Sequence, residues 1–224
     1  PAEQTPLSAL ALAELAERAG IPAGVINIVT GMDGPAIGKT LCDDDRIRKM
    51  TFTGSTEVGR ILMRQSAGTL KKMSLELGGN APLIVFDDAD IDTAIAGTMA
   101  SKYRNAGQTC VCANRIFVQD GIYGEFSRRL TEATAAMKVG NGMEDGVEQG
   151  PIIDGQGLDK IERHVADARA KGAEVLTGGG RHALGGTYFE PTVLTGMTPE
   201  MEMFREETFG PVAGLFRFST DDEA

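Results

Sequence analysis

The sequence of 224 residues has few of the features that mark several classes of protein. Its three cysteines are an odd number, and Cys110 and Cys112 are separated by one residue, so they predict no disulfide framework and fit a reducing compartment. No apolar run approaches the roughly 18 to 20 residues of a membrane span, and the first residues lack a signal-peptide pattern. We therefore expect a cytoplasmic protein with no membrane partner.

Basic residues and histidines are also scarce. The 22 Lys and Arg residues are outnumbered by 32 Asp and Glu residues, and no basic block is longer than Lys71-Lys72, so a nucleic-acid backbone would be repelled. The two histidines are His164, in a charged predicted helix, and His182, beside a glycine turn. Neither suits the histidine base of a cysteine hydrolase, and their spacing from Cys42 and the other cysteines matches no known zinc ligand set. We expect no nucleic acid and no metal.

The order of the predicted elements indicates an α/β fold, because helical and extended patterns alternate along the chain. The first part predicts helices over 7–16, 35–42 and 55–67 and strands over 25–29, 49–53 and 73–77. The second part predicts strands over 83–86, 116–118, 174–177, 188–194 and 212–218 and helices over 91–103, 123–137 and 158–171. The glycines and proline of 78–82 form the candidate boundary, since such residues allow a hinge. Two domains, 1–77 and 78–224, follow.

Two residues offer a nucleophile and a base. Cys110 lies in a polar, glycine-containing turn, Arg104-Asn-Ala-Gly-Gln-Thr-Cys-Val-Cys112, and Glu76 lies 34 positions earlier in Ser74-Leu-Glu-Leu-Gly-Gly-Asn80. A thiolate that attacks a carbonyl and a carboxylate that activates water suit acyl chemistry. Each residue also has a simpler interpretation, an inert buried thiol for Cys110 and a solvated strand residue for Glu76.

Two further motifs accompany them. Gly54-Ser-Thr-Glu-Val-Gly59 follows a predicted strand and opens a predicted helix, where free N–H groups favour a phosphate, although glycines needed for packing would look the same. Glu206-Glu-Thr-Phe-Gly-Pro211 precedes a predicted strand and could equally be a solvated acidic turn. With the Cys110 and Glu76 segments, these motifs resemble the aldehyde dehydrogenase superfamily, and the Arg-Asn-x-Gly-Gln-Thr-Cys-x-Cys run is most similar to the succinate-semialdehyde dehydrogenases.

The resemblance implies roles for the two central residues. The residue matching Cys110 attacks the aldehyde, and the residue matching Glu76 activates the water that hydrolyses the thioester, which favours a free acid as product. The matching Arg104 binds the far carboxylate of a semialdehyde by paired hydrogen bonds, with a surface arginine as the alternative. Cys112 matches a second cysteine that serves some members as a redox partner, and simple packing is its alternative.

The resemblance also implies an NAD or NADP cofactor and a fold in which part of a Rossmann-type nucleotide-binding domain, 1–77, precedes an α/β catalytic domain. The cofactor contacts implied are Glu3, Gly54, Ser55, Gly59, Leu77, Glu207 and Phe209. The carboxylate of Glu3 near the ribose would repel a 2′-phosphate, which tilts the expectation towards NAD. The resemblance covers the whole chain but about half of the family's usual length, so we expect a central fragment of a homo-oligomeric dimer or tetramer.

Overall fold

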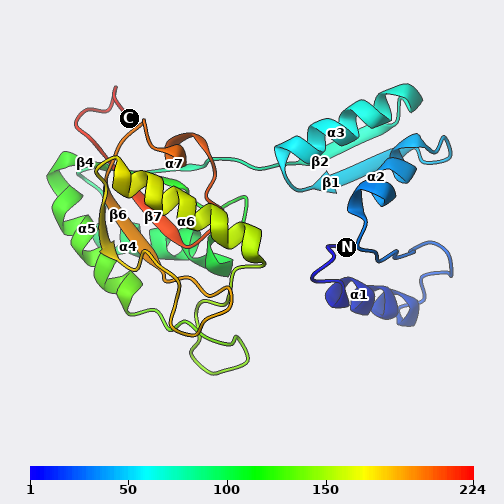
Figure 1. Ribbon diagram of the computed structural model, residues 1–224, viewed down its shortest axis with the longest axis horizontal. Coiled ribbons are helices and arrows are strands. Elements are labelled where there is room, and N and C mark those ends of the chain that lie inside the picture. The colour runs from blue at the N-terminus through cyan, green and yellow to red at the C-terminus, as the bar shows by residue number, and fades with distance from the viewer. The chain divides into compact units, whose positions relative to one another are not determined.

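The computed structural model describes residues 1–224, which form two compact units, Pro1–Gly78 and Gly79–Ala224 (Figure 1). Both units combine helices with parallel strands, which confirms the α/β fold class. No helix combines the length and apolar character needed to cross a membrane. The assignment of the units to nucleotide binding and catalysis remains a prediction.

The first unit contains a two-stranded parallel sheet and three α-helices. Strand β1 (Lys49–Thr53) pairs with β2 (Lys72–Glu76), and α2 (Gly34–Asp43) packs with α3 (Thr56–Ser66) beside them. The 3-10 turn η1 (Ala67–Thr69) follows α3. A small core joins these elements, formed by Cys42, Met50 and Leu62 with Phe52 and Met73. By contrast, α1 (Leu7–Arg18) buries none of its residues.

The prediction of a buried strand over 25–29 is wrong. Val25 and Val29 are 65% and 67% exposed, and the segment is a turn in which Val25 N donates to Pro22 O at 3.2 Å. A strand requires a hydrogen-bonded neighbour, and β1 and β2 pair only with each other. The β-branched residues therefore remain in a solvent-facing loop.

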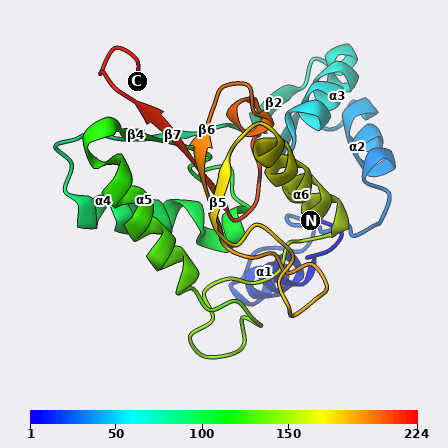
Figure 2. The same cartoon turned by 60° about the vertical axis from the view of Figure 1, so that its left-hand side comes forward.

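The second unit is a three-layer α/β/α arrangement. Its sheet has the order β3-β4-β7-β6-β5, in which β5 alone is antiparallel to its neighbour. Helices α4 and α5 cover one face and α6 covers the other, as the turned view shows (Figure 2). The strands are β3 (Pro82–Val85), β4 (Arg115–Gln119), β5 (Glu174–Thr177), β6 (Thr192–Met197) and β7 (Val212–Phe218). The helices are α4 (Ile91–Lys102), η2 (Arg104–Gly107), α5 (Asp120–Ala135), α6 (Gly155–Ala170) and α7 (Glu202–Arg205).

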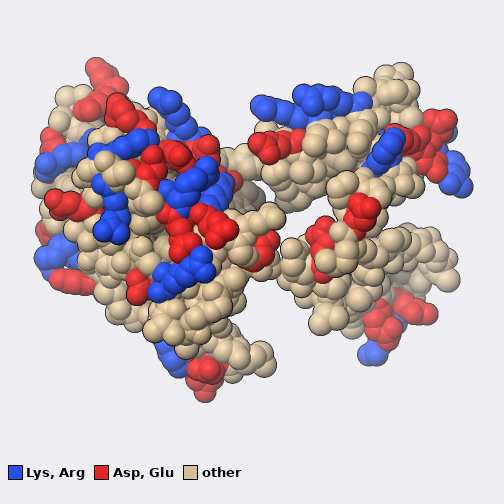
Figure 3. Space-filling view, in the orientation of Figure 1, with Lys and Arg blue, Asp and Glu red and all other residues tan.

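The central strand β7 divides the core between the two faces. Val212 and Phe216 pack with α6, whereas Ala213 and Leu215 pack with α4 and α5, in keeping with the alternation of side chains along a strand. All residues of β7 except Arg217 are buried. Lys, Arg, Asp and Glu side chains are interspersed over the face of this unit drawn in Figure 3, which displays no extended basic surface.

Candidate active site

Three segments of the second unit meet at one edge of the sheet. Strands β3, β4 and β7 are parallel neighbours, so the residues that precede them lie at the same end. These residues are Gly79–Ala81 before β3, the Cys110 turn before β4, and the 206–211 motif before β7. The topology therefore brings the predicted cysteine loop and the predicted Glu207 loop together.

The turn that precedes Cys110 has an unusual backbone. Asn105, Ala106 and Gly107 have positive φ angles of 52°, 56° and 71°. Gly107 is required, because an added Cβ would lie 2.1 Å from Gly210 O. Consecutive left-handed residues are strained and persist only where the surroundings fix them. Here the 206–211 segment fixes them by close backbone contact.

Gln108 secures the same turn from another side. Its Oε1 accepts a hydrogen bond from Ile153 N at 2.9 Å, and its Nε2 donates to Pro151 O at 3.3 Å. The side chain of Asn105 donates to Gln108 O at 3.1 Å. The turn that carries Cys110 is therefore held by the 206–211 segment and by the 151–153 segment. A reacting group needs such a fixed position.

The three cysteines have different surroundings. Cys110 is exposed, whereas Cys42 and Cys112 are buried. The thiol of Cys112 contacts Lys102 O, at the end of α4, at 3.3 Å and Ala113 O at 3.5 Å, so it is engaged with neighbouring backbone. Cys110 is thus the one thiol that a solvent-borne electrophile can reach.

A buried lysine lies next to Cys112. Lys102, the last residue of α4, is fully buried and its Nζ has no hydrogen-bond partner. Burial lowers the pKa of Lys102, while the nearby Cys112 and Glu207 oppose that shift. The pKa of Glu207 is raised by burial, against a hydrogen bond from the Gly79 backbone and the charges of Lys160 and Lys102. No sequence pattern indicates that Lys102 is buried, since a lysine at a helix end usually faces solvent.

Phe209 and Arg104 are available for ligands. Phe209 has a positive φ of 55° and is 40% exposed beside Gly210. Arg104 is exposed and forms no ion pair or side-chain hydrogen bond in this structure. The second unit therefore offers an exposed aromatic ring and a guanidinium without a protein partner in addition to the exposed thiol.

The first unit carries Glu76 and the remaining predicted site residues. Glu76 ends β2 on its exposed face. Met73 and Leu75 alternate with it on the half-buried face, and Met73 packs against the core. Leu77 packs on α3, where a Cβ at Gly59 would lie 2.6 Å from Leu77 Cδ2. Gly59 therefore has a packing reason to be glycine.

The N-terminus of α3 has the properties of an anion site. Ser55 is its N-cap and accepts from Val58 N at 3.2 Å, and a Cβ at Gly54 would lie 2.4 Å from the ring of Phe52. The first-turn N–H groups of a helix lack intrahelical acceptors, and Ser55 is exposed, so this helix end can attract an anion. Glu57 in the same turn opposes an anion. Glu3 lies elsewhere in this unit, with its Oε1 3.0 Å from a Cβ built at Gly34.

A buried histidine cluster lies next to the 206–211 segment. His164 of α6 is fully buried, and its Nδ1 is 3.1 Å from Thr208 Oγ1. Its Nε2 is 3.8 Å from Glu202 and 3.5 Å from Glu206, and the Arg163 guanidinium contacts both carboxylates. Because the Arg163 guanidinium already places a positive charge beside both carboxylates, we interpret Arg163, His164, Glu202 and Glu206 as an ion-pair cluster.

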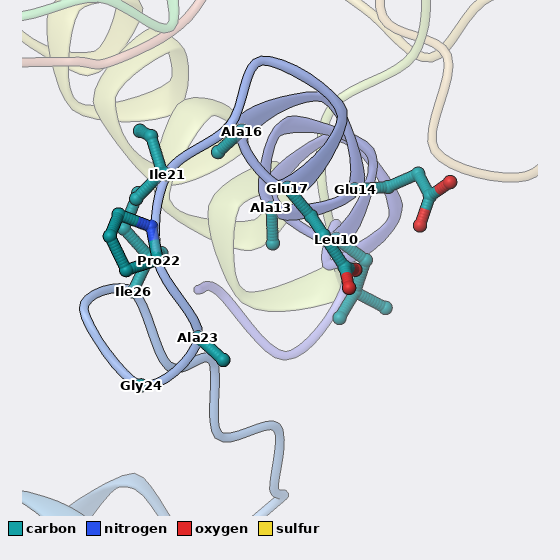
Figure 4. A pocket seen from close by; sticks show the side chains of 10 residues that line it. All are labelled: Leu10, Ala13, Glu14, Ala16, Glu17, Ile21, Pro22, Ala23, Gly24 and Ile26. Carbon is teal, nitrogen blue, oxygen red and sulfur yellow. The ribbon is translucent and has the colours of Figure 1, made fainter.

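The first unit also contains an open pocket of about 390 Å³ between α1 and the turn at 21–26 (Figure 4). Leu10, Ala13 and Ile26 are among the residues that line it, and none of the predicted site residues does. The pocket is therefore unrelated to the proposed chemistry.

Comparison with known proteins decides the family. The profile described as "Aldehyde dehydrogenase family" matches residues 1–224. The chain belongs to this family. It is 61% identical to a 3-sulfolactaldehyde dehydrogenase of Pseudomonas putida, 58% identical to a glutarate-semialdehyde dehydrogenase of Pseudomonas aeruginosa and 57% identical to a succinate-semialdehyde dehydrogenase [NADP(+)] of Escherichia coli.

Each of these alignments covers 100% of the chain and 46% of the relative, so the chain spans about half the length of the curated relatives it matches. The crystal structure of succinate-semialdehyde dehydrogenase from Burkholderia pseudomallei superposes with a TM-score of 0.98 at 58% identity, again over 100% of this chain and 46% of that one. The aldehyde dehydrogenase fold predicted from the sequence is therefore confirmed.

Proposed function

We propose that Cys110 is the nucleophile and Glu76 the general base of an NAD(P)-dependent semialdehyde dehydrogenase that converts succinate semialdehyde to succinate. The observation that carries the proposal is the position of Cys110. It is the one exposed thiol, and it follows a backbone-constrained turn in contact with the Glu207 segment. A reactive cysteine needs this combination of access and fixed geometry.

The chain's own residues divide the reaction into two stages. The Cys110 thiolate attacks the aldehyde carbon, so a C–S bond forms and the carbonyl oxygen takes the negative charge. A bound nicotinamide cofactor would supply the hydride acceptor for that carbon, and Cys110 then holds the oxidised acyl group as a thioester. Glu76 then removes a proton from water, the resulting hydroxide attacks the thioester, and the C–S bond breaks to release the acid and the thiolate.

Arg104 supports the choice of an anionic aldehyde. Its guanidinium is exposed and without an ion-pair partner, so it can bind a carboxylate at the far end of the substrate by charge-assisted hydrogen bonds. The three relatives are named for succinate semialdehyde, glutarate semialdehyde and 3-sulfolactaldehyde, each an aldehyde with an acidic group at the other end. Glutarate semialdehyde is the second candidate substrate.

The cofactor would be held by the first unit through Glu3, Gly54, Ser55, Gly59 and Leu77, with Glu207 and Phe209 at the nicotinamide end. We propose NAD rather than NADP, because the carboxylate of Glu3 near the ribose would repel a 2′-phosphate. The E. coli relative named for NADP(+) supports the opposite choice. The ratio of kcat/KM for NAD and NADP decides between them, and Glu3→Gln should move that ratio towards NADP.

The test of the function uses the complete gene product that carries this sequence. Oxidation of succinate semialdehyde, glutarate semialdehyde and butanal is followed by cofactor absorbance in the wild type, Cys110→Ala and Cys42→Ala. We expect preference for the anionic aldehydes, complete loss with Cys110→Ala and retained activity with Cys42→Ala, which removes a buried thiol. Aldehyde oxidation by Cys110→Ala at the wild-type rate would exclude the proposal, and no oxidation by the wild type would favour a protein that keeps the fold without turnover.

A further inference from the structure

Asn114 lies at the centre of the sheet edge where the three site segments meet. It is four residues after Cys110 and 1% exposed. Its Nδ2 donates to Asn80 Oδ1 at 2.5 Å and has longer contacts of 3.2 Å with Met203 O and 3.3 Å with Glu206 O. Its Oδ1 accepts from Thr208 N at 3.1 Å. Asn114 belongs to the segment before β4. Its side chain binds both the segment before β3 and the segment before β7.

Asn80 extends this connection. Its Nδ2 donates to Phe204 O at 2.8 Å, and its backbone carbonyl accepts from Arg115 Nε and Nη2 at 2.9 Å and 2.6 Å. The residue before it, Gly79, provides the backbone hydrogen bond to the Glu207 carboxylate. The two asparagines thus satisfy backbone groups on both sides of Glu207.

The contacts of the two asparagines lie beside the strained part of the site. Phe209 has a left-handed backbone, and Gly107 has its α-carbon against the carbonyl of Gly210. Such conformations hold only where neighbouring interactions over-determine them. The hydrogen bonds of Asn114 to Glu206 O and Thr208 N flank Glu207 and supply that constraint.

We propose that Asn114, with Asn80, is a positioning residue that holds the Glu207–Gly210 segment in register with the Cys110 turn. This inference rests on the proposed function for its kinetic consequence, while the structural linkage itself can be measured without turnover. The chemistry of Cys110 as a thiol does not depend on Asn114. What depends on it is the placement of the cofactor-facing segment relative to that thiol.

The experiment compares Asn114→Ala, Asn80→Ala and the double variant in the complete gene product. The control is Gln149→Ala, which removes another buried amide of the same unit. The side chain of Gln149 donates to Phe189 O at 2.8 Å and forms no hydrogen bond with the three site segments. Amide hydrogen exchange of peptides covering 104–112 and 203–210, the rate of Cys110 alkylation by iodoacetamide without cofactor, and single-turnover cofactor reduction are measured on each protein.

We expect faster exchange in 203–210 for both asparagine variants, an unchanged alkylation rate, and a fall of about 10- to 100-fold in the single-turnover rate for Asn114→Ala. The double variant should be little slower than Asn114→Ala, since residues of one network are not additive. Gln149→Ala should lose stability without either effect. If Asn114→Ala does not fold, Asn80→Ala carries the test, because Asn80 is only partly buried.

Two results overturn the inference. One is unchanged exchange in 203–210 for both asparagine variants, and the other is a single-turnover loss in Gln149→Ala equal to that in Asn114→Ala. A wild type that oxidises no aldehyde contradicts the proposed function instead, and the exchange data then still decide whether Asn114 links the segments.

Discussion

Gly107 gives the sharpest structural prediction, because replacing it by alanine creates a contact that no side chain can relieve. The added Cβ would lie 2.1 Å from Gly210 O, 2.5 Å from Gly210 C and 3.1 Å from Lys102 O. Restoring an ordinary contact of 3.4 Å requires a backbone shift of about 1.3 Å, the difference between 3.4 Å and 2.1 Å. The shift would separate the Cys110 turn from the Glu207 segment.

The magnitude has two parts. A left-handed φ of 71° costs alanine roughly 1–2 kcal/mol relative to glycine. Overpacking against backbone costs about 1–3 kcal/mol more. We therefore expect Gly107→Ala to lower the free energy of unfolding by about 2–5 kcal/mol and, through a displacement of about 1 Å at the thiol, to slow hydride transfer about 100-fold.

The control is Gly124→Ala. Gly124 lies in α5 with no atom within 4 Å of an added Cβ, so alanine there should raise the free energy of unfolding by about 0.5–1 kcal/mol and leave turnover unchanged. Urea unfolding and single-turnover cofactor reduction are measured on both variants. Gly107→Ala with wild-type stability and wild-type turnover would refute the described backbone contact.

Three other predictions concern single side chains. Glu76→Gln should keep hydride transfer but slow thioester hydrolysis, so a burst of reduced cofactor precedes a slow steady state, and an unchanged steady-state rate would exclude Glu76 as the base. Arg104→Ala should raise KM for succinate semialdehyde far more than for butanal, by the roughly 1.5–3 kcal/mol of a charge-assisted hydrogen bond, whereas equal losses would make Arg104 structural. His164 has a lowered pKa, chiefly from burial and also from Lys160 and Arg163, with Glu206 and Glu202 opposing. The unfolded chain therefore takes up the proton first as the pH falls through about 6.5, and the free energy of unfolding should decrease from pH 7 to 5.5, with a smaller decrease in His164→Gln.

Local patterns in the sequence predicted most of the fold. Strands over 49–53, 174–177 and 212–218 coincide with β1, β5 and β7, because runs of extended pattern ended by turn residues are encoded locally. The run at 25–29 is rich in β-branched residues, which favour strands, but it has no neighbouring strand in the structure. Pairing is a long-range property, so composition alone could not distinguish these cases.

The candidate site was predictable only in its reactive residues. The exposed thiol of Cys110 and the glycine-containing turn before it have a local signature in the sequence. The bonds from Asn114 to Asn80 and Thr208 span 34 and 94 positions, and no short motif indicates them. The burial of Lys102 could not be predicted from the sequence either. It results from the packing of α4 and the Cys110 turn, and not from the residues next to Lys102 in the chain.

The central claim is that Cys110 forms a covalent acyl intermediate. The most direct measurement is peptide mass spectrometry of the Glu76→Gln protein quenched with acid after a single turnover with succinate semialdehyde and NAD. The account predicts one succinyl group on the peptide that contains Cys110, and none in Cys110→Ala. Cofactor reduction with an unmodified Cys110 peptide, or an acyl group found on another residue, would contradict it.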